Sequence, residues 1–360
     1  DKVCLFMLLQ YSLLHAAVAW RVPPSNEPIA VRAVELPLVW LVFGVLTCAF
    51  VWRFASIRDL AQIWRRIAPA ALIAAFIVMS VDNFTGFRGD DCRVAAFVWN
   101  PIVPPVFFTI FVVASFFGWQ SFGRSARLIR YLLVVMAVIM ATAYSGSRMI
   151  FLTQVLTFAG LAFIVPVGDI RQRAKVVAFV GGAGVLGLST GLAMDLMTDC
   201  GFVEKLRQLF MAASTLDPDE GVSINARAIL LERGWQAVQG APWLGYGIAF
   251  EKQLSEPYYH LHNQYLTWTL WGGVFSLISG LMFILSASLR PLRLAGRGGL
   301  VLALAATGVL ALNSLTDSLL YHTMFQLHYL MVLTLVFGLG RTAADAGDFS
   351  SQEQRSSLSS

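Results

Sequence analysis

The sequence predicts an all-α, polytopic membrane protein with about ten transmembrane helices and one large periplasmic loop subdomain. Of its 360 residues, 57% are hydrophobic and only 13% are charged, whereas an ordinary soluble domain is roughly 25% charged. Apolar runs long enough to cross about 30 Å of hydrocarbon as helices recur along nearly the whole chain. Basic residues gather in alternate connections between these runs, as in a chain that crosses a bilayer repeatedly.

Ten apolar segments account for the predicted spans. In lipid, each backbone polar group must be satisfied within its own helix or in a closed barrel, and these runs are too continuous for alternating barrel strands. Helices are therefore expected at residues 3–20, 36–52, 67–81, 102–119, 132–144, 149–167, 176–194, 266–285, 300–315 and 324–339. The chain begins with Asp1 rather than Met, which leaves open whether further spans precede it.

Four connections between the predicted spans are rich in Lys and Arg, as short cytoplasmic loops are. They carry Arg53, Arg58, Arg65 and Arg66; Arg124, Arg127 and Arg130; Arg171, Arg173 and Lys175; and Arg290, Arg293 and Arg297. Both termini are then cytoplasmic, and the loops around residues 82–100, 145–148, 195–260 and 317–322 lie outside. The net charge of +5 is mostly a topology signal, and no nucleic-acid partner is expected.

Four regions are expected along the chain. Residues 1–194 form an N-terminal transmembrane bundle, residues 195–261 a periplasmic loop subdomain, and residues 262–340 the C-terminal transmembrane helices. Residues 341–360, rich in Ser, Gln and Asp, bury too little apolar surface to order themselves and are expected to form a disordered cytoplasmic tail. Cys92 and Cys200 both fall in outer loops, where an oxidising compartment permits a disulfide; spacing alone does not decide whether they pair.

Within the loop subdomain, residues 225–239 are expected to form an amphipathic helix that Gly240 and Pro242 terminate. Arg227 is expected on its buried or substrate-facing side. The apolar residues that share one face at helical spacing are Ala228, Leu231, Trp235 and Val238.

Residues 257–266 bring two of the five histidines, His260 and His262, to the entry of a predicted span. A histidine titrates near neutral pH and, correctly placed, contributes about 10²- to 10⁴-fold in rate as a general base. The alternative is that both are interfacial polar residues beside an aromatic belt. That belt consists of Tyr258, Tyr259, Tyr265 and Trp268.

Two arginines expected outside the membrane are candidates for binding an anionic group. Arg148 ends the very short turn 145–148, and Arg227 lies on the loop helix near Arg233. A guanidinium is permanently charged and presents a planar fork of donors suited to phosphate oxygens. The alternatives are an interfacial anchor for Arg148 and a solvated helix charge for Arg227.

No metal or cofactor is expected. The sequence has no CxxC motif and no cluster of Cys and His residues. The acidic run at residues 217–220 superficially resembles a metal-binding DxD pair, but its proline and the following glycine indicate an exposed loop. Further polar candidates are His15 and His328 within spans, for which no partner can be assigned, and Asp317 and His322 on the last outer loop, which could approach the site.

Three segments expected outside the membrane carry these candidates. They are the turn SGSRM, the stretch NARAILLERGWQAV followed by PWLGYG, and the run HLHNQYL leading into LWGGVF. In order, spacing and common placement they resemble the signature of the bacterial O-antigen ligase and O-antigen polymerase superfamily of integral membrane glycan transferases. The resemblance covers roughly residues 143–280 in motifs and the rest of the chain by hydropathy only.

The resemblance implies a metal-independent, inverting glycosyltransferase of GT-C-like architecture without a cofactor. Such an enzyme transfers a glycan from an undecaprenyl-diphosphate carrier to an acceptor hydroxyl at the periplasmic face of the bacterial inner membrane. The glycines of the PWLGYG segment would let the backbone approach the substrate closely. The implied residues are His262 as catalytic base, Arg148 and Arg227 as diphosphate ligands, and His260, Asn263, Gly245 and Gly247 in support.

The acceptor and the functional class stay open at this stage. A ligase transfers to lipid A core and a polymerase to a second lipid-linked glycan, and the motifs do not separate the two. A transporter or flippase of lipid-linked sugars is the competing class, in which polar residues would line a path across the bilayer. The gathering of the polar candidates on the outer face favours a transferase.

Overall fold

The computed structural model describes residues 58–84, 102–117, 123–145, 147–165, 170–198, 222–247, 261–317 and 335–340, together with residues 250, 254, 319, 329, 332 and 333. These residues are helical or lie in turns and connections, and no strand occurs among them, which confirms the all-α prediction. The predicted spans at 3–20 and 36–52, Cys92 and Cys200, the acidic run 217–220 and the tail 341–360 lie outside the described residues.

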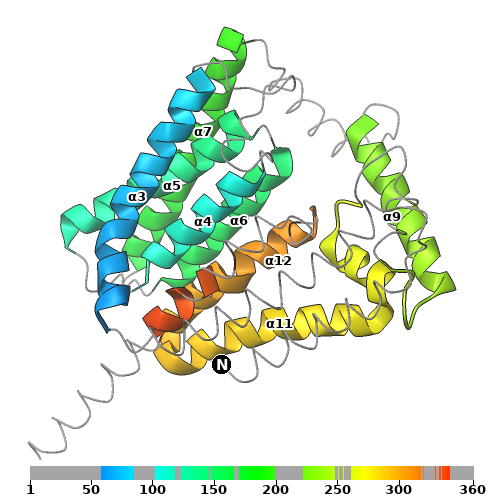
Figure 1. The fold of residues 1–360 in the computed structure, drawn as a ribbon. Coiled ribbons are helices and arrows are strands. Elements are labelled where there is room, and N and C mark those ends of the chain that lie inside the picture. Colours follow the sequence, from blue (N-terminus) through cyan, green and yellow to red (C-terminus); the bar gives the residue numbers. More distant parts are fainter. Residues whose placement is uncertain are drawn as a thin grey trace, which may run out of the picture.

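Five long helices form a bundle in the first half of the described chain, side by side in Figure 1. Each coincides with one of the five apolar runs expected between residues 67 and 194. The third helix continues as a π-helical segment, Met140–Tyr144. The five helices are α3 (Arg58–Phe84), α4 (Val103–Ser115), α5 (Arg124–Ile139), α6 (Arg148–Ile164) and α7 (Ile170–Thr198).

The second half contributes α9 (Val222–Gly240), α11 (Gln264–Ala303), a π-helical segment (Leu304–Gly308) and α12 (Val309–Ser314). In Figure 1, α11 and α12 lie along one side of the bundle. Helix α9 stands apart from the bundle. It lies beside the beginning of α11 and is steeply inclined to α11. The predicted loop helix at 225–239 is thereby confirmed, with its end at Gly240 as expected.

The chain of α11 doubles back on itself before α12. The hydroxyls of Ser288 and Thr307, 19 residues apart, hydrogen-bond to each other, although a straight helix would separate them by about 28 Å at 1.5 Å per residue. A Cβ placed on Gly299 would overlap the carbonyl oxygen of Pro291. The reversal therefore lies around residues 291–299 and separates the predicted spans 266–285 and 300–315.

Apolar side chains fill the interior of the bundle and also cover much of its outside. Ile110 of α4, Leu133 of α5 and Leu310 of α12 are fully buried in one core. Leu128 of α5 and Val185 of α7, however, are about two-thirds exposed at 69% and 65%. Such large outward-facing apolar residues suit a lipid environment better than water.

Two of the described helices are long and apolar enough to cross a membrane, judged by length and composition alone. They are Arg124–Thr142 and Gln264–Arg293. Four shorter apolar helices accompany them, at Ile67–Val81, Val103–Ser115, Met149–Ile164 and Gly298–Ser314. These helices support a membrane protein.

Candidate functional site

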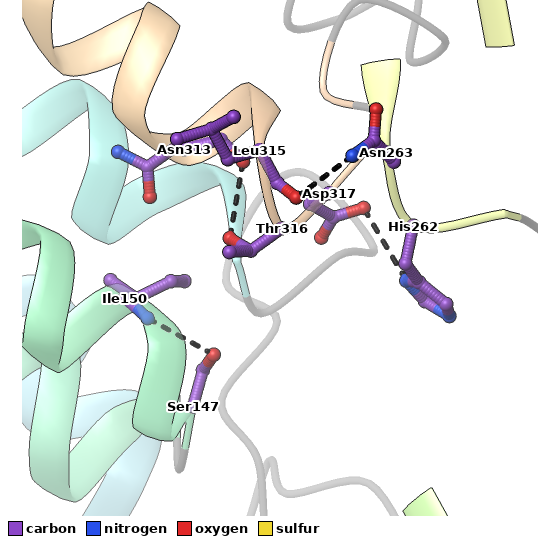
Figure 2. A network of polar contacts seen from close by, with 8 residues as sticks. All are labelled: Ser147, Ile150, His262, Asn263, Asn313, Leu315, Thr316 and Asp317. Carbon is purple, nitrogen blue, oxygen red and sulfur yellow. Dashed lines mark hydrogen bonds and ion pairs between the residues drawn. The ribbon is translucent and has the colours of Figure 1, made fainter. Parts of the chain in front are cut away.

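His262 lies in the connection that leads into α11, outside the helix itself. Its backbone φ of 52° places it in the left-handed region, which non-glycine residues seldom adopt. Its Nδ1 atom lies 3.7 Å from Oδ1 of Asp317, and the two side chains are 32% and 11% exposed. Figure 2 shows the imidazole beside this carboxylate.

Asn263 fixes the position of His262 by joining two elements. Its Oδ1 accepts a hydrogen bond of 2.9 Å from the backbone N–H of Leu266, which makes Asn263 the N-cap of α11. Its Nδ2 donates to the carbonyl oxygen of Leu315, 3.2 Å away, just after α12. On the other side of the histidine, Leu261 is completely buried. His262 therefore lies between two anchored neighbours, of which Figure 2 shows Asn263.

Asp317 is held in a turn that closes the end of α12. Its backbone N–H and that of Thr316 both donate to the carbonyl oxygen of Asn313, each at 3.0 Å. The sequence marked Asp317 only as a loop residue that could approach the site. Its contact with His262 joins two parts of the chain that are far apart in sequence, so no local sequence pattern could predict this contact.

The turn before α6 lies at the same end of the bundle. Ser147 is the N-cap of α6, and its Oγ accepts from the backbone N–H of Ile150 at 3.4 Å. Thr153, one turn further along, donates to Oδ1 of Asn313 at 2.9 Å, which ties α6 to the end of α12. Figure 2 shows Ser147 facing the turn that carries Asp317.

The two candidate arginines lie in the first halves of α6 and α9. Arg148 is the first residue of α6, so the turn preceding the helix is as short as expected; its side chain is not among those described. Arg227 is half-buried in the first half of α9. Because it is one turn from the buried Leu230, it lies on the side of α9 that faces α11.

The packed face of α9 differs from the predicted apolar face. Leu230 and Val238 are buried, and a Cβ on Gly234 would overlap Leu266 of α11. Of the four apolar residues predicted to share one face, only Val238 is buried, whereas Leu231 and Trp235 are 40% and 60% exposed. Two adjacent stripes of α9 are apolar, and helical periodicity alone does not say which one packs against protein.

The turn that follows α9 is bonded to a break in α11. Gly273, within α11, has a φ of +65°, so the helix cannot continue regularly there. Val274 N–H donates at 2.8 Å to the carbonyl oxygen of Pro242 rather than to that of Leu270 four residues earlier. The Leu270 carbonyl oxygen accepts from the backbone N–H of Tyr246 at 2.7 Å instead. The turn thus supplies the hydrogen bonds that the break removes.

The glycines of this turn are required by that close approach. Gly245 has a φ of +61° and Gly247 one of +90°, both favoured only by glycine. A Cβ on Gly245 would lie 2.7 Å from the backbone nitrogen of Gly273 and overlap the carbonyl oxygen of Leu270. The backbone that Gly245 approaches is that of α11, and a contact of either glycine with substrate stays a prediction.

The site combines the imidazole of His262, the carboxylate of Asp317 and the N-terminal ends of α6 and α11. A carboxylate next to an imidazole orients the ring and stabilises its protonated form. The first turns of α6 and α11 present backbone N–H groups and a partial positive charge toward this end of the bundle. Together these groups suit a reaction in which a hydroxyl loses its proton to a base beside an anionic group.

His15, His260, His322 and His328 lie outside the described residues, so their relation to this site stays a prediction. Among the residues that are described, no group of three or more His, Cys, Asp or Glu side chains is placed to hold a metal ion. Compared with known proteins, the chain matches no family model, and no curated sequence is significantly similar to it.

Proposed function

We propose that this chain is a membrane-embedded glycosyltransferase of the O-antigen ligase and polymerase type. It transfers a glycan from an undecaprenyl-diphosphate carrier to an acceptor hydroxyl, with lipid A core as the favoured acceptor and a second lipid-linked glycan as the close alternative. One observation carries the proposal: His262 lies beside Asp317 at the end of the bundle where α6 begins with Arg148.

In this reaction the acceptor oxygen attacks the anomeric carbon of the glycan while the bond from that carbon to the diphosphate oxygen breaks. The acceptor proton passes to His262, and the electron pair of the broken bond leaves with the carrier diphosphate. Asp317, 3.7 Å from Nδ1 of the histidine, stabilises the imidazolium that forms. A single displacement of this kind inverts the anomeric configuration.

Arg148 and Arg227 would neutralise the diphosphate as it leaves. Charge-assisted hydrogen bonds from guanidinium groups are directed and strong, and each contributes about 1.5–3 kcal/mol. In this proposal the arginines take the part that a divalent ion has in many other glycosyltransferases, so transfer proceeds without added metal. The partial positive charge at the start of α6 acts in the same direction.

The membrane topology belongs to the same proposal. About ten helices span the bacterial inner membrane, with the His262 end of the bundle at the periplasmic face. Support comes from the seven described helical segments that coincide with predicted spans and from the apolar residues exposed on the outside of the bundle. The basic connections, at Arg124 and Arg293 for example, lie on the cytoplasmic side in this topology.

The test is glycan transfer by the purified protein in lipid nanodiscs. An undecaprenyl-diphosphate oligosaccharide is offered with lipid A core or with a second lipid-linked oligosaccharide, in the presence and absence of EDTA. Product on one acceptor, indifferent to EDTA and lost in His262→Asn, would establish the transferase and decide between ligase and polymerase. Lack of product on both acceptors, from protein that unfolds cooperatively on heating, would overturn the proposal.

A transporter of lipid-linked sugars is favoured by one feature, the glycine break in α11, since interrupted helices form substrate sites in many transporters. In α11, however, the freed backbone groups bond to the turn after α9. Movement of a fluorescent lipid-linked sugar across proteoliposomes, without any transfer, would select the transporter.

A further inference from the structure

Helix α9 carries three different stripes along its length. One stripe, with Leu230, Gly234 and Val238, packs against the beginning of α11. A second is polar and exposed, with Gln236 donating a 3.3 Å hydrogen bond to Glu232. The third, between them, is apolar yet exposed, and it carries Ala228, Leu231 and Trp235.

The exposed apolar stripe does not end with the helix. In the turn after α9, Trp243 and Leu244 are exposed at 66% and 48%. The ring of Trp243 lies 6.2 Å, centroid to centroid, from the ring of Phe275 on α11. The exposed apolar residues therefore follow one another along the chain from the loop helix to the turn, and Trp243 joins the turn to one of the two helices long enough to cross a membrane.

Phe275 begins an outward-facing stripe on α11. The exposed residues Phe275, Ile278, Met282 and Leu285 recur at helical spacing along it. In a membrane-spanning helix such a stripe faces the acyl chains. Trp243 then marks the level at which the hydrocarbon ends, because indole side chains collect at the boundary between acyl chains and headgroups.

We propose that α9 is an interfacial helix that lies on the bilayer surface, with Trp235, Leu231 and Trp243 inserted at headgroup depth. At the boundary between protein, lipid and water, such a helix packs against protein with one stripe, contacts lipid with its exposed apolar stripe and contacts water with its polar stripe. The occupant of the exposed stripe is lipid, since its residues lead along the chain to Trp243, which lies against the lipid-facing side of α11.

The position of α9 has a consequence for the proposed donor site. Arg227 lies on the protein-facing side of the same helix, so it is brought to the depth of the lipid headgroups. The diphosphate of a lipid-linked donor lies at this depth too. This consequence rests on the proposed function, whereas the interfacial position of α9 rests only on the membrane insertion of α11.

The test is fluorine NMR of the full chain in nanodiscs, with its ten tryptophans replaced by 5-fluorotryptophan. The resonances of Trp235 and Trp243 are assigned by their loss in Trp235→Phe and Trp243→Phe. A nitroxide near the glycerol end of the acyl chain is added in lipid, and a gadolinium chelate is added in water in a separate sample. Ile278→Trp supplies a reference resonance on the lipid-facing side of α11.

The expected result is severalfold broadening of the Trp235 and Trp243 resonances by the lipid nitroxide, as for Ile278→Trp. Broadening of Trp235 mainly by the aqueous chelate would place the stripe in water and overturn the inference. Protection from both agents would mean that protein covers the stripe, which overturns it too. If the Ile278→Trp resonance itself were unaffected by the nitroxide, membrane insertion of α11 would fail, and the inference with it.

A second pair of variants tests whether the face of α9 matters rather than the helix as a whole. In the Trp235→Phe background, Ala228→Trp returns a tryptophan to the apolar stripe and Gln236→Trp places one on the polar stripe. The lipid nitroxide is expected to broaden the first new resonance severalfold and the aqueous chelate the second. Equal response of both to one agent would contradict a helix that lies at the interface.

Discussion

The two helices that begin at the candidate site, α6 and α11, hold their candidate residue in opposite ways. Both start with a side-chain cap, Ser147 in α6 and Asn263 in α11. Arg148 follows its cap and belongs to the helix, whereas His262 precedes its cap and has a left-handed backbone. The difference teaches that α6 itself fixes the backbone of Arg148, while the position of His262 depends on its neighbours and on Asp317.

The largest effect expected from this difference is on the chemistry at the start of α11. His262→Asn removes the base but keeps a residue that tolerates the left-handed conformation. Glycan transfer should fall by about 10²- to 10⁴-fold, with the thermal unfolding midpoint in nanodiscs unchanged. His262→Ala should lose as much activity and also unfold at lower temperature, because left-handed alanine costs roughly 1–2 kcal/mol. Transfer above about a tenth of wild type in His262→Asn would show that another group is the base.

The next effect concerns the helix-bound residue at the start of α6. Arg148→Lys keeps the charge but loses the planar fork, so about 1.5–3 kcal/mol of diphosphate binding is at stake, which is roughly 10- to 100-fold in transfer. Arg293→Lys, at the reversal within α11, is the matched control and should be silent. Equal activity of Arg148→Lys and wild type would mean that Arg148 acts by charge alone or lies away from the donor.

A smaller effect is expected from the partner of His262. Asp317→Asn removes the charge that stabilises the imidazolium, which for a partly exposed pair is worth up to about 1 kcal/mol, or about fivefold in kcat. KM for the acceptor should not change, since Asp317 acts through the histidine. Loss of activity through KM alone would place Asp317 in the acceptor site instead. Thr316→Val, which leaves the carboxylate in place, serves as the control.

The smallest expected effect is a difference in stability between variants of the two N-caps, Asn263 and Ser147. Asn263→Ala loses a 2.9 Å cap bond and the 3.2 Å bond to Leu315, and should cost about 1–2 kcal/mol. Ser147→Ala loses a single bond of 3.4 Å and should cost about 0.5–1 kcal/mol. The unfolding midpoint of Asn263→Ala should therefore be the lower of the two. The reverse order would show that α6, not α11, is the more dependent on its cap.

The elements that follow from short-range patterns could be predicted from the sequence. The end of α9 at Gly240 and the very short turn before Arg148 are signalled by glycine, proline and serine within a few residues. Asn263 was not predicted as the N-cap of α11, although an asparagine directly before an apolar run is a common start signal. These features depend on hydrogen bonds between residues close in sequence.

The features that depend on distant contacts could not be predicted in the same way. The contact of His262 with Asp317 and the bonding of the turn at Tyr246 to α11 each join segments that no periodicity relates. The stripe of α9 that packs against α11 could not be predicted for a related reason. Trp235 and Leu230 are both apolar, and the sequence does not say whether protein or lipid covers each of them.

The most direct test of the proposed site is a double-mutant cycle on single-turnover glycan transfer, with His262→Asn, Arg148→Lys and the two combined. If the beginnings of α6 and α11 serve one reaction as a unit, the double variant should be no more than about threefold slower than His262→Asn alone, because residues that act together are strongly non-additive. Losses that multiply in full would contradict a shared site, since distant and independent positions add their free energies.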